Sequence, residues 1–232
     1  MSTLSTPIPP DLVVTERLAE RPARTPDFRA ESLALTSLAR GFAGTNANAF
    51  REVTEAALHL CGAQSAGISL IERDGNAKIF RWVAVSGAWA KYLGGSLPRD
   101  ASPCGLVVDA GAWQLMAHPH THYIDIRDAD PPIVEVLLVP FHILGEIVGT
   151  VWVIAHDQQK VFDAEDLRLM TNLADFAGAA YLTRERLVAD AEVRDELTRS
   201  NERLKRSNER LWAQLGHPSV PSEAREDQGA ID

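Results

Sequence analysis

The spacing of apolar residues predicts two amphipathic helices in the first quarter of the chain. In residues 31–44, apolar side chains recur near helical spacing. The stripe is clearer in residues 48–62, where Phe50, Val53 and the positions that follow fall on one helical face. Gly62 is a typical stop signal at the end of such a helix. We therefore expect two helices before the first strand.

The middle of the chain shows the pattern of β-strands, with apolar and β-branched residues alternating or running together. Asp74-Gly75 and Gly145-Glu146 are turn signals between such segments, which predicts two hairpins. A long irregular insert separates the hairpins and contains "CGLVVDA" (104–110), which predicts one helical turn. The expected strands are residues 65–73, 78–87, 113–118, 133–143 and 147–156.

A long helix is expected to follow the last strand, from residue 164 onward. Asp163 can cap its N-terminus, and Glu165 and Asp166 in its first turn suit the helix dipole. The element order is helix, helix, hairpin, insert with a strand, hairpin, long helix. This order predicts an α+β architecture, in which an antiparallel sheet carries helices packed on one face.

Both ends of the chain differ from this structured part. Residues 1–30 contain five prolines among polar residues, which predicts a flexible N-terminal arm. Residues 216–232 form a second polar segment, which predicts a disordered tail. The sequence contains no run of about 20 apolar residues that would predict a membrane span. Its start has neither the basic nor the apolar region of a secretory signal.

Composition narrows the class of protein. The chain has 232 residues, of which 45% are hydrophobic and 24% charged, as in a globular protein. Its net charge of −9 argues against a nucleic-acid groove, which needs clustered Lys and Arg. Two cysteines, Cys61 and Cys104, do not make a disulfide framework. We therefore expect a cytoplasmic protein with free thiols.

A heptad is repeated near the C-terminus, where "RSNERLK" (199–205) is followed by "RSNERLW" (206–212). Placing the leucines at heptad position d puts asparagines at position a, which favours a parallel two-stranded coiled coil. Asp190 and Arg194 fall on the same seam and would weaken it. The alternative is a single solvated helix, although a charged helix of this length has little to hold it alone. The expected interface of the homodimer consists of Leu197, Asn201, Leu204, Asn208, Leu211 and Leu215.

The element order and several stretches resemble the GAF domain, a sensory module found in bacterial sensor kinases. "VTEAALHLCGAQSAGISLIE" resembles the first helix and strand of that family, and "DASPCGLVVDAGAWQLMAH" resembles its pocket-side helix. "LLVPF…GEIVGTVWVIAH…FDAEDLRLM" is the most specific match. The resemblance implies a GAF domain over residues 31–182, followed by a signalling helix over 183–215.

The same resemblance implies a function. We expect a non-enzymatic sensory protein in signal transduction, which binds an unknown small molecule or partner and relays this through its dimeric helix. In the sensor kinases such a helix leads to an ATP-binding domain, but this sequence has no Gly-rich ATP motif. A kinase or other regulator would therefore be a separate partner. Two alternatives stay open: an interaction adaptor without a ligand, and a thiol redox sensor or enzyme that uses Cys104.

A ligand pocket would lie between the sheet and the long insert, and aromatic residues with a few polar groups would line it. The candidates are Trp82, Trp89, Ser102, Cys104, Trp113, His118 and His120. "HPHTHY" places three histidines at alternate positions, which suits a metal site, a pocket rim or plain surface. Pro119 interrupts the run and no acidic or Cys ligand has metal-motif spacing, so we expect no metal.

The sequence argues against several chemistries of GAF-type proteins. In GAF domains that attach a bilin covalently, the attachment signature includes a Cys followed by a His, whereas here Gly105 follows Cys104. The sequence also lacks the Cys-x-x-Cys-His motif of covalent haem attachment. The free methionine sulfoxide reductases of this fold depend on several cysteines. GAF domains that bind cyclic GMP often share a residue pattern that ends in Glu. This sequence matches the pattern only in part, because Leu167 occupies the position of that Glu. The redox alternative depends on Cys104 lying at a helix N-terminus, where the dipole would lower the pKa of its thiol.

Overall fold

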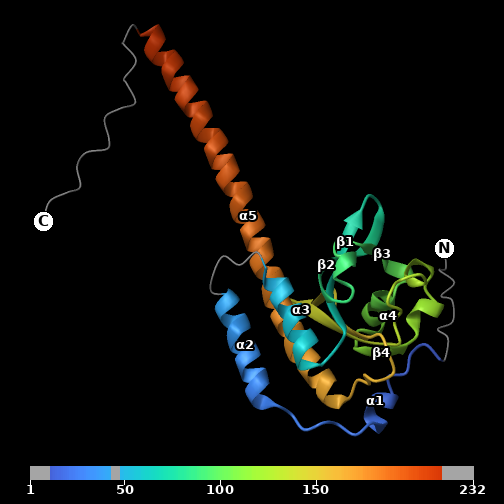
Figure 1. Ribbon diagram of the computed structural model, residues 1–232. Helices are drawn as coiled ribbons and strands as arrows, with labels where there is room; N and C mark the ends of the chain where they lie inside the picture. The colour runs from blue at the N-terminus through green and yellow to red at the C-terminus, as the bar shows by residue number, and fades with distance from the viewer. Residues whose placement is uncertain (1–10, 43–47, 216–232) are drawn as a thin grey trace, which may run out of the picture. The chain divides into compact units, whose positions relative to one another are not determined.

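A computed structural model describes residues 11–42 and 48–215 (Figure 1). The chain forms two compact units, residues 1–184 and 185–232. The predicted tail at 216–232 and the first ten residues of the predicted arm lie outside the described residues. The α-helices of the described part are α1 (Arg17–Glu20), α2 (Phe28–Phe42), α3 (Ala49–Leu60), α4 (Pro103–Ala110) and α5 (Ala164–Gln214).

The first unit is built on a six-stranded sheet of order β3-β2-β1-β6-β5-β4, in which all neighbouring strands are antiparallel. This confirms the predicted α+β class and the five predicted strands. The short β3, which lies in the insert, was not expected. The strands are β1 (Ser65–Asp74), β2 (Ala77–Gly87), β3 (Ser96–Pro98), β4 (Gln114–Ala117), β5 (Glu135–Ile143) and β6 (Glu146–Ala155).

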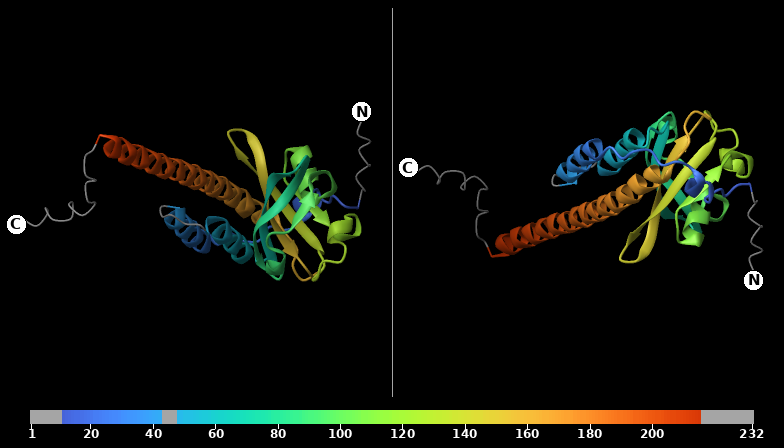
Figure 2. Two further views of the ribbon diagram at one scale, coloured as in Figure 1. Left: turned by 90° about the horizontal axis from the view of Figure 1, so that it is seen from above. Right: turned by 90° about the horizontal axis from the view of Figure 1, so that it is seen from below.

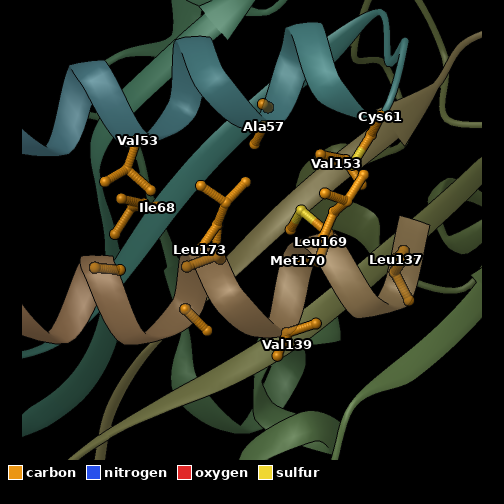
Figure 3. Close-up of a cluster of buried hydrophobic side chains, with 14 of the residues drawn as sticks. Val53, Ala57, Cys61, Ile68, Leu137, Val139, Val153, Leu169, Met170 and Leu173 are labelled. Carbon is orange, nitrogen blue, oxygen red and sulfur yellow. The ribbon is translucent and has the colours of Figure 1, made fainter. Parts of the chain in front are cut away.

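One side of the sheet, here called the aliphatic face, is covered by α3 and by the first part of α5. Alternate residues of β6, such as Val151 and Val153, point to this side. They contact Val53 of α3 and Leu173 of α5 in one buried cluster, part of which Figure 3 shows. The period-two pattern of the strands thus meets the helical stripes predicted from the sequence.

The other side, here called the aromatic face, takes the intervening residues of the same strands, such as Trp152 and Ile154 of β6. It is covered by α4 and by four short 3₁₀ helices and loops of the insert, on the opposite side of the sheet from α3 (Figure 2). The prediction that helices lie on one face therefore holds for α3 and α5 but not for α4. The 3₁₀ helices are Ala90–Tyr92, Arg99–Ala101, Pro119–Thr121 and Ile124–Ile126.

Residues 11–27 are packed against the domain, which differs from the flexible arm predicted for residues 1–30. Leu12 and Leu18 are buried, and Val14 N donates to Leu115 O at 2.8 Å. Ala117 N donates to Leu12 O at 2.9 Å, so the segment pairs with the outer edge of β4. Proline content shows where a helix cannot form, but not that nearby apolar residues will find a sheet edge.

The first turn of α5 is closed by a reciprocal pair of carboxylates. Asp166 N donates to Asp163 Oδ1 at 2.9 Å, and Asp163 N donates to Asp166 Oδ2 at 3.0 Å. This is a capping box with Asp in the place of Glu, and it confirms the predicted cap. Arg24 Nη1 lies 2.7 Å from Asp166 Oδ1, so the N-terminal segment is fixed to the start of this helix.

Candidate functional site

Four aromatic rings fill the centre of the aromatic face. We call Trp82, Trp89, Tyr92 and Trp152 the aromatic cluster. The centroids of the rings in contact lie 5.2 to 6.3 Å apart, mostly in edge-to-face arrangements. Such separations are favourable for aromatic pairs. The predicted pocket residues Trp82 and Trp89 are therefore brought together, but they contact each other rather than line an open space.

Trp152 reaches the cluster because its neighbour on β1 has no side chain. Gly67 pairs with Trp152 across the two strands, and a Cβ atom at Gly67 would overlap the indole ring. The ring thus lies directly against the backbone of β1, and its Nε1 donates to Ser69 Oγ at 2.9 Å. Strand alternation alone could have placed Ser69 and Trp152 on this face, opposite Ile68 and Val153.

Cys104 lies at the edge of this cluster in a chain of buried polar groups. Thr150 Oγ1 donates to Cys104 Sγ at 3.2 Å, and Cys104 Sγ donates to Ser69 Oγ at 3.7 Å. All three side chains are buried. Sequence reasoning missed Ser69 and Thr150. The two residues face each other across β1 and β6, and this pairing appears only in the folded sheet.

The environment of Cys104 does not activate its thiol in the way the redox alternative requires. Cys104 lies in the first turn of α4, as expected, and Ser102 caps the helix by accepting from Gly105 N at 3.2 Å. However, burial raises the pKa of the Cys104 thiol, and the hydrogen bonds with Thr150 and Ser69 only partly offset this. The pKa of this thiol is therefore raised by its surroundings, whereas the redox alternative needs a lowered pKa.

The remaining tryptophan candidate lies elsewhere. Trp113 packs against the cluster of the aliphatic face, not against the aromatic cluster. It immediately precedes β4, and strand alternation puts it on the side opposite Met116. Residue type alone suggested a pocket role, but the face of the sheet decides which cluster a tryptophan joins.

The histidine run does not form a strand face. β4 ends at Ala117, and His118 adopts a left-handed backbone conformation (φ 45°) that opens a 3₁₀ helix. The rings of His118 and His120 are 5.8 Å apart and nearly perpendicular, and His120 Nδ1 is 2.8 Å from Ile133 O. Within residues 11–42 and 48–215, no three His, Cys, Asp or Glu side chains are grouped to hold a metal ion.

His156, at the end of β6, is a site residue that the sequence did not indicate. Its ring lies 5.9 Å from that of Trp89, and its Nε2 lies 2.7 Å from Ser65 Oγ. Burial lowers the pKa of His156, and nearby Asp157 and Asp130 only partly counter this. No spacing rule signals this residue, because its partners come from three separate segments.

The second unit presents its heptad leucines to solvent. Leu197, Leu204, Leu211 and Leu215 are 62%, 60%, 53% and 71% exposed. Asn201 and Asn208 are exposed on the same helix. Ion pairs along the helix, such as Arg206 to Glu202 at 3.1 Å, supply polar contacts. No helix among the described residues has the length and apolarity needed to cross a membrane.

Comparison with known proteins identifies the class. The GAF domain family matches residues 47–181, and the chain therefore belongs to the GAF domain family. This confirms the resemblance that the sequence suggested. GAF domains often serve as sensory modules in signal transduction. No curated protein matches the chain.

Several solved structures share the fold. The free methionine-R-sulfoxide reductase from Neisseria meningitidis, in complex with its substrate, is 14% identical with a TM-score of 0.55; the match covers 72% of this chain and 97% of that one. The GAF domain of a phosphoenolpyruvate-protein phosphotransferase from Coxiella burnetii is 17% identical with a TM-score of 0.54, over 70% and 99%. The GAF domain of A. aeolicus nlh2 in an inactive state is 15% identical with a TM-score of 0.51, over 68% and 98%. At such identities the likeness concerns the fold alone.

Proposed function

We propose that this chain is a non-enzymatic, cytoplasmic regulatory GAF protein of signal transduction that works as a parallel homodimer through residues 185–215. The observation that carries the proposal is the exposure of four leucines at heptad spacing, between 53% and 71%. A leucine contributes about 1.5–3 kcal/mol when it is buried, so a second copy of the same helix is a favourable partner.

The two asparagines support a parallel arrangement in register. Asn201 and Asn208 occupy successive a positions, and each would meet its own counterpart only if the two helices run in the same direction. Positions Asp190 and Arg194 interrupt the seam, so the coiled coil would extend from Leu197 to Leu215. Regulation through such a helix requires that the first units of both copies be held in one complex.

The environment of Cys104 supports a non-enzymatic role. A nucleophilic thiol needs a lowered pKa and an adjacent base. The groups bonded to Cys104 Sγ are the hydroxyls of Thr150 and Ser69, and burial raises the pKa of the thiol. The likeness to a sulfoxide reductase is a likeness of fold, which carries no activity with it.

The aromatic cluster favours a protein partner over a small molecule as the input. Its rings occupy the space between the sheet and the insert, where a ligand would bind. A second candidate function is a ligand sensor whose aromatic cluster parts on binding. The buried hydrogen-bonding groups of Ser69, Thr150 and Cys104 favour that candidate, because they could be turned toward a ligand.

Sedimentation velocity on the full chain tests the dimer. We expect a dimer at tens of micromolar for the wild type and a monomer for Leu204→Glu, which places a charge in the seam. Val188→Glu is the matched control, because Val188 is half exposed on the same helix at heptad position b. A monomeric wild type, or equal effects of both substitutions, would refute the proposal.

Cross-linking tests the direction of the helices. A cysteine introduced as Leu215→Cys should form a disulfide between two copies in a parallel coil, because the same residues meet. In an antiparallel coil, Leu215 would lie beside Leu197 of the other copy, and the two introduced thiols would be roughly 27 Å apart at 1.5 Å per residue. Dimers that form no disulfide would exclude the parallel arrangement.

A further inference from the structure

Three consecutive backbone carbonyls, of residues 131–133, each accept a hydrogen bond from a side-chain ring nitrogen. Two of these residues are prolines, which have no N–H and cannot be held by full strand pairing. The rings therefore attach the segment that leads into β5 to the rest of the aromatic face. The pairs are Trp89 Nε1 with Pro131 O, His156 Nδ1 with Pro132 O, and His120 Nδ1 with Ile133 O, each at 2.8 Å.

The partners of His156 place a hydrogen on Nδ1 and suit the neutral ring. The carbonyl of Pro132 can only accept, so Nδ1 must donate. On the other side of the ring, Nε2 lies 2.7 Å from Ser65 Oγ. Ser65 Oγ already accepts from Trp89 N at 3.0 Å, which leaves its own hydrogen to donate to Nε2. Nε2 is thus an acceptor in the neutral ring, and a proton there would displace the Ser65 hydrogen and force this buried hydroxyl to turn away.

His120 behaves differently, although it makes the same kind of contact. Its Nδ1 donates to Ile133 O, and it remains a donor whether the ring is neutral or protonated. A change of charge on His120 therefore leaves this hydrogen bond in place. Of the two histidines that hold residues 131–133, His156 is the one whose hydrogen bond with Ser65 would be reversed by protonation.

The charged groups around His156 do not reverse the preference of its site for the neutral ring. Asp157, which follows it in the chain, and Asp130, in the loop before β5, both favour the charged ring. Asp130 is itself paired with Lys91 at 3.4 Å, and its backbone contacts the hydroxyl of Tyr92. Asp130 is exposed and Asp157 is partly exposed, so water screens their effect, and burial of the imidazole is the larger influence.

We propose that His156 is an acid-sensitive latch, in which protonation of Nε2 removes the hydrogen bond that Ser65 donates to it, places a charge in a partly buried site, releases residues 131–133 and opens the aromatic face. The proton comes from solvent and no covalent bond other than this N–H changes. Above the ordinary pKa of histidine the ring is neutral and the latch is closed. As the pH falls, the open form binds the proton more tightly than the closed form, so opening is favoured. The latch lies within the first unit and does not require the dimer.

NMR on the full chain tests the latch through two signals, the ring nitrogens of His156 and the protection of the Trp89 indole N–H against exchange. At about pH 8 we expect the Nδ1–H tautomer of His156 and a protected indole. Toward about pH 5, protection should fall in step with the titration of His156. The protection factor should fall by about tenfold for each unit by which the pKa of His156 in the closed form lies below that in the open form.

Three variants separate the latch from general acid effects. His156→Asn can still donate to Pro132 O but cannot titrate, so the indole should stay protected at low pH. Ser65→Ala removes the donor to Nε2, so His156 should titrate, and the indole lose protection, at higher pH. His142→Asn, an exposed histidine at the end of β5, is the matched control and should behave as wild type.

Two outcomes would overturn the proposal. One is a Trp89 indole that stays protected while His156 of the wild type becomes charged. The other is loss of protection at the same pH in His142→Asn and His156→Asn, which would assign the opening to other groups. If His156→Asn does not fold, the wild type and Ser65→Ala decide the matter, because the pH at which protection is lost must follow the His156 titration in both.

Discussion

The two faces of the sheet are both buried, but they are stabilised in different ways. The aliphatic face is covered by α3 and α5, whose backbone groups are satisfied within each helix, and its contacts are mainly between branched side chains. The aromatic face is covered by short helices and loops, and its tryptophans need hydrogen-bond partners such as Ser69 and Pro131. An irregular cover depends on individual side-chain contacts, so it can open where a helical cover stays closed.

The largest effect is expected at Trp152, which makes both ring contacts and a side-chain hydrogen bond on the aromatic face. Trp152→Ala should lower the free energy of unfolding by about 3–5 kcal/mol, because it leaves a cavity and removes the donor to Ser69. Urea unfolding measures this. Trp152→Phe keeps a ring but not the N–H and should cost less. Equal losses for both variants would mean that the ring volume contributes little.

A large-to-small change on the aliphatic face gives the other side of the comparison. Leu173 is fully buried on α5, and Leu173→Ala should cost about 2–5 kcal/mol in urea unfolding. Leu182→Ala on the same helix is the control, because Leu182 is 40% exposed. If the control lost as much stability as Leu173→Ala, burial on this face would not be the source of the effect.

The two buried thiols report which face opens first. Cys61 belongs to the aliphatic cluster and Cys104 to the aromatic one. In single-cysteine variants, Cys61→Ala and Cys104→Ala, a maleimide should label Cys104 at least about tenfold faster than Cys61, which corresponds to about 1.4 kcal/mol less for local opening. Equal rates would show that both thiols become accessible only by global unfolding.

The smallest effect concerns the ion pair that fixes α2 beside α5. Arg168 donates to both carboxylate oxygens of Glu31, at 2.9 and 2.6 Å, and Asn172 adds a third bond. The Arg168 hydrogen bonds lower the pKa of Glu31 despite its burial. The stabilisation of the fold by this ion pair is therefore complete above the ordinary carboxylate pKa, and it is lost as the pH falls through the lowered pKa of Glu31.

Glu31→Gln should reduce stability by about 1 kcal/mol at neutral pH and by less in acid, because the wild type has lost the pair there. Thermal unfolding followed from neutral to acidic pH measures the difference between the two proteins. Glu55→Gln, in an exposed pair with Arg51, is the control. A difference that did not shrink in acid would contradict the assignment to this carboxylate.

The sequence predicted much of the fold because its elements have clear periods. The stripes of α3 and the alternation of β5 and β6 each specify one buried face, and Asp163 marks the start of α5. The site was predicted in part. Trp82, Trp89 and Cys104 do meet, but Trp113 lies on the other face, and Tyr92, Trp152 and His156 were not proposed for the site.

The sequence by itself determined the positions of the longer helices and of the five longer strands, and it placed a heptad pattern at residues 197–215, because these features depend on neighbours a few positions apart. The tertiary structure decided which side chains meet across the sheet. Gly67 admits the ring of Trp152, residues 11–27 pair with β4, and three rings hold residues 131–133. Such contacts join segments distant along the chain, and local periodicity contains no information about their distances.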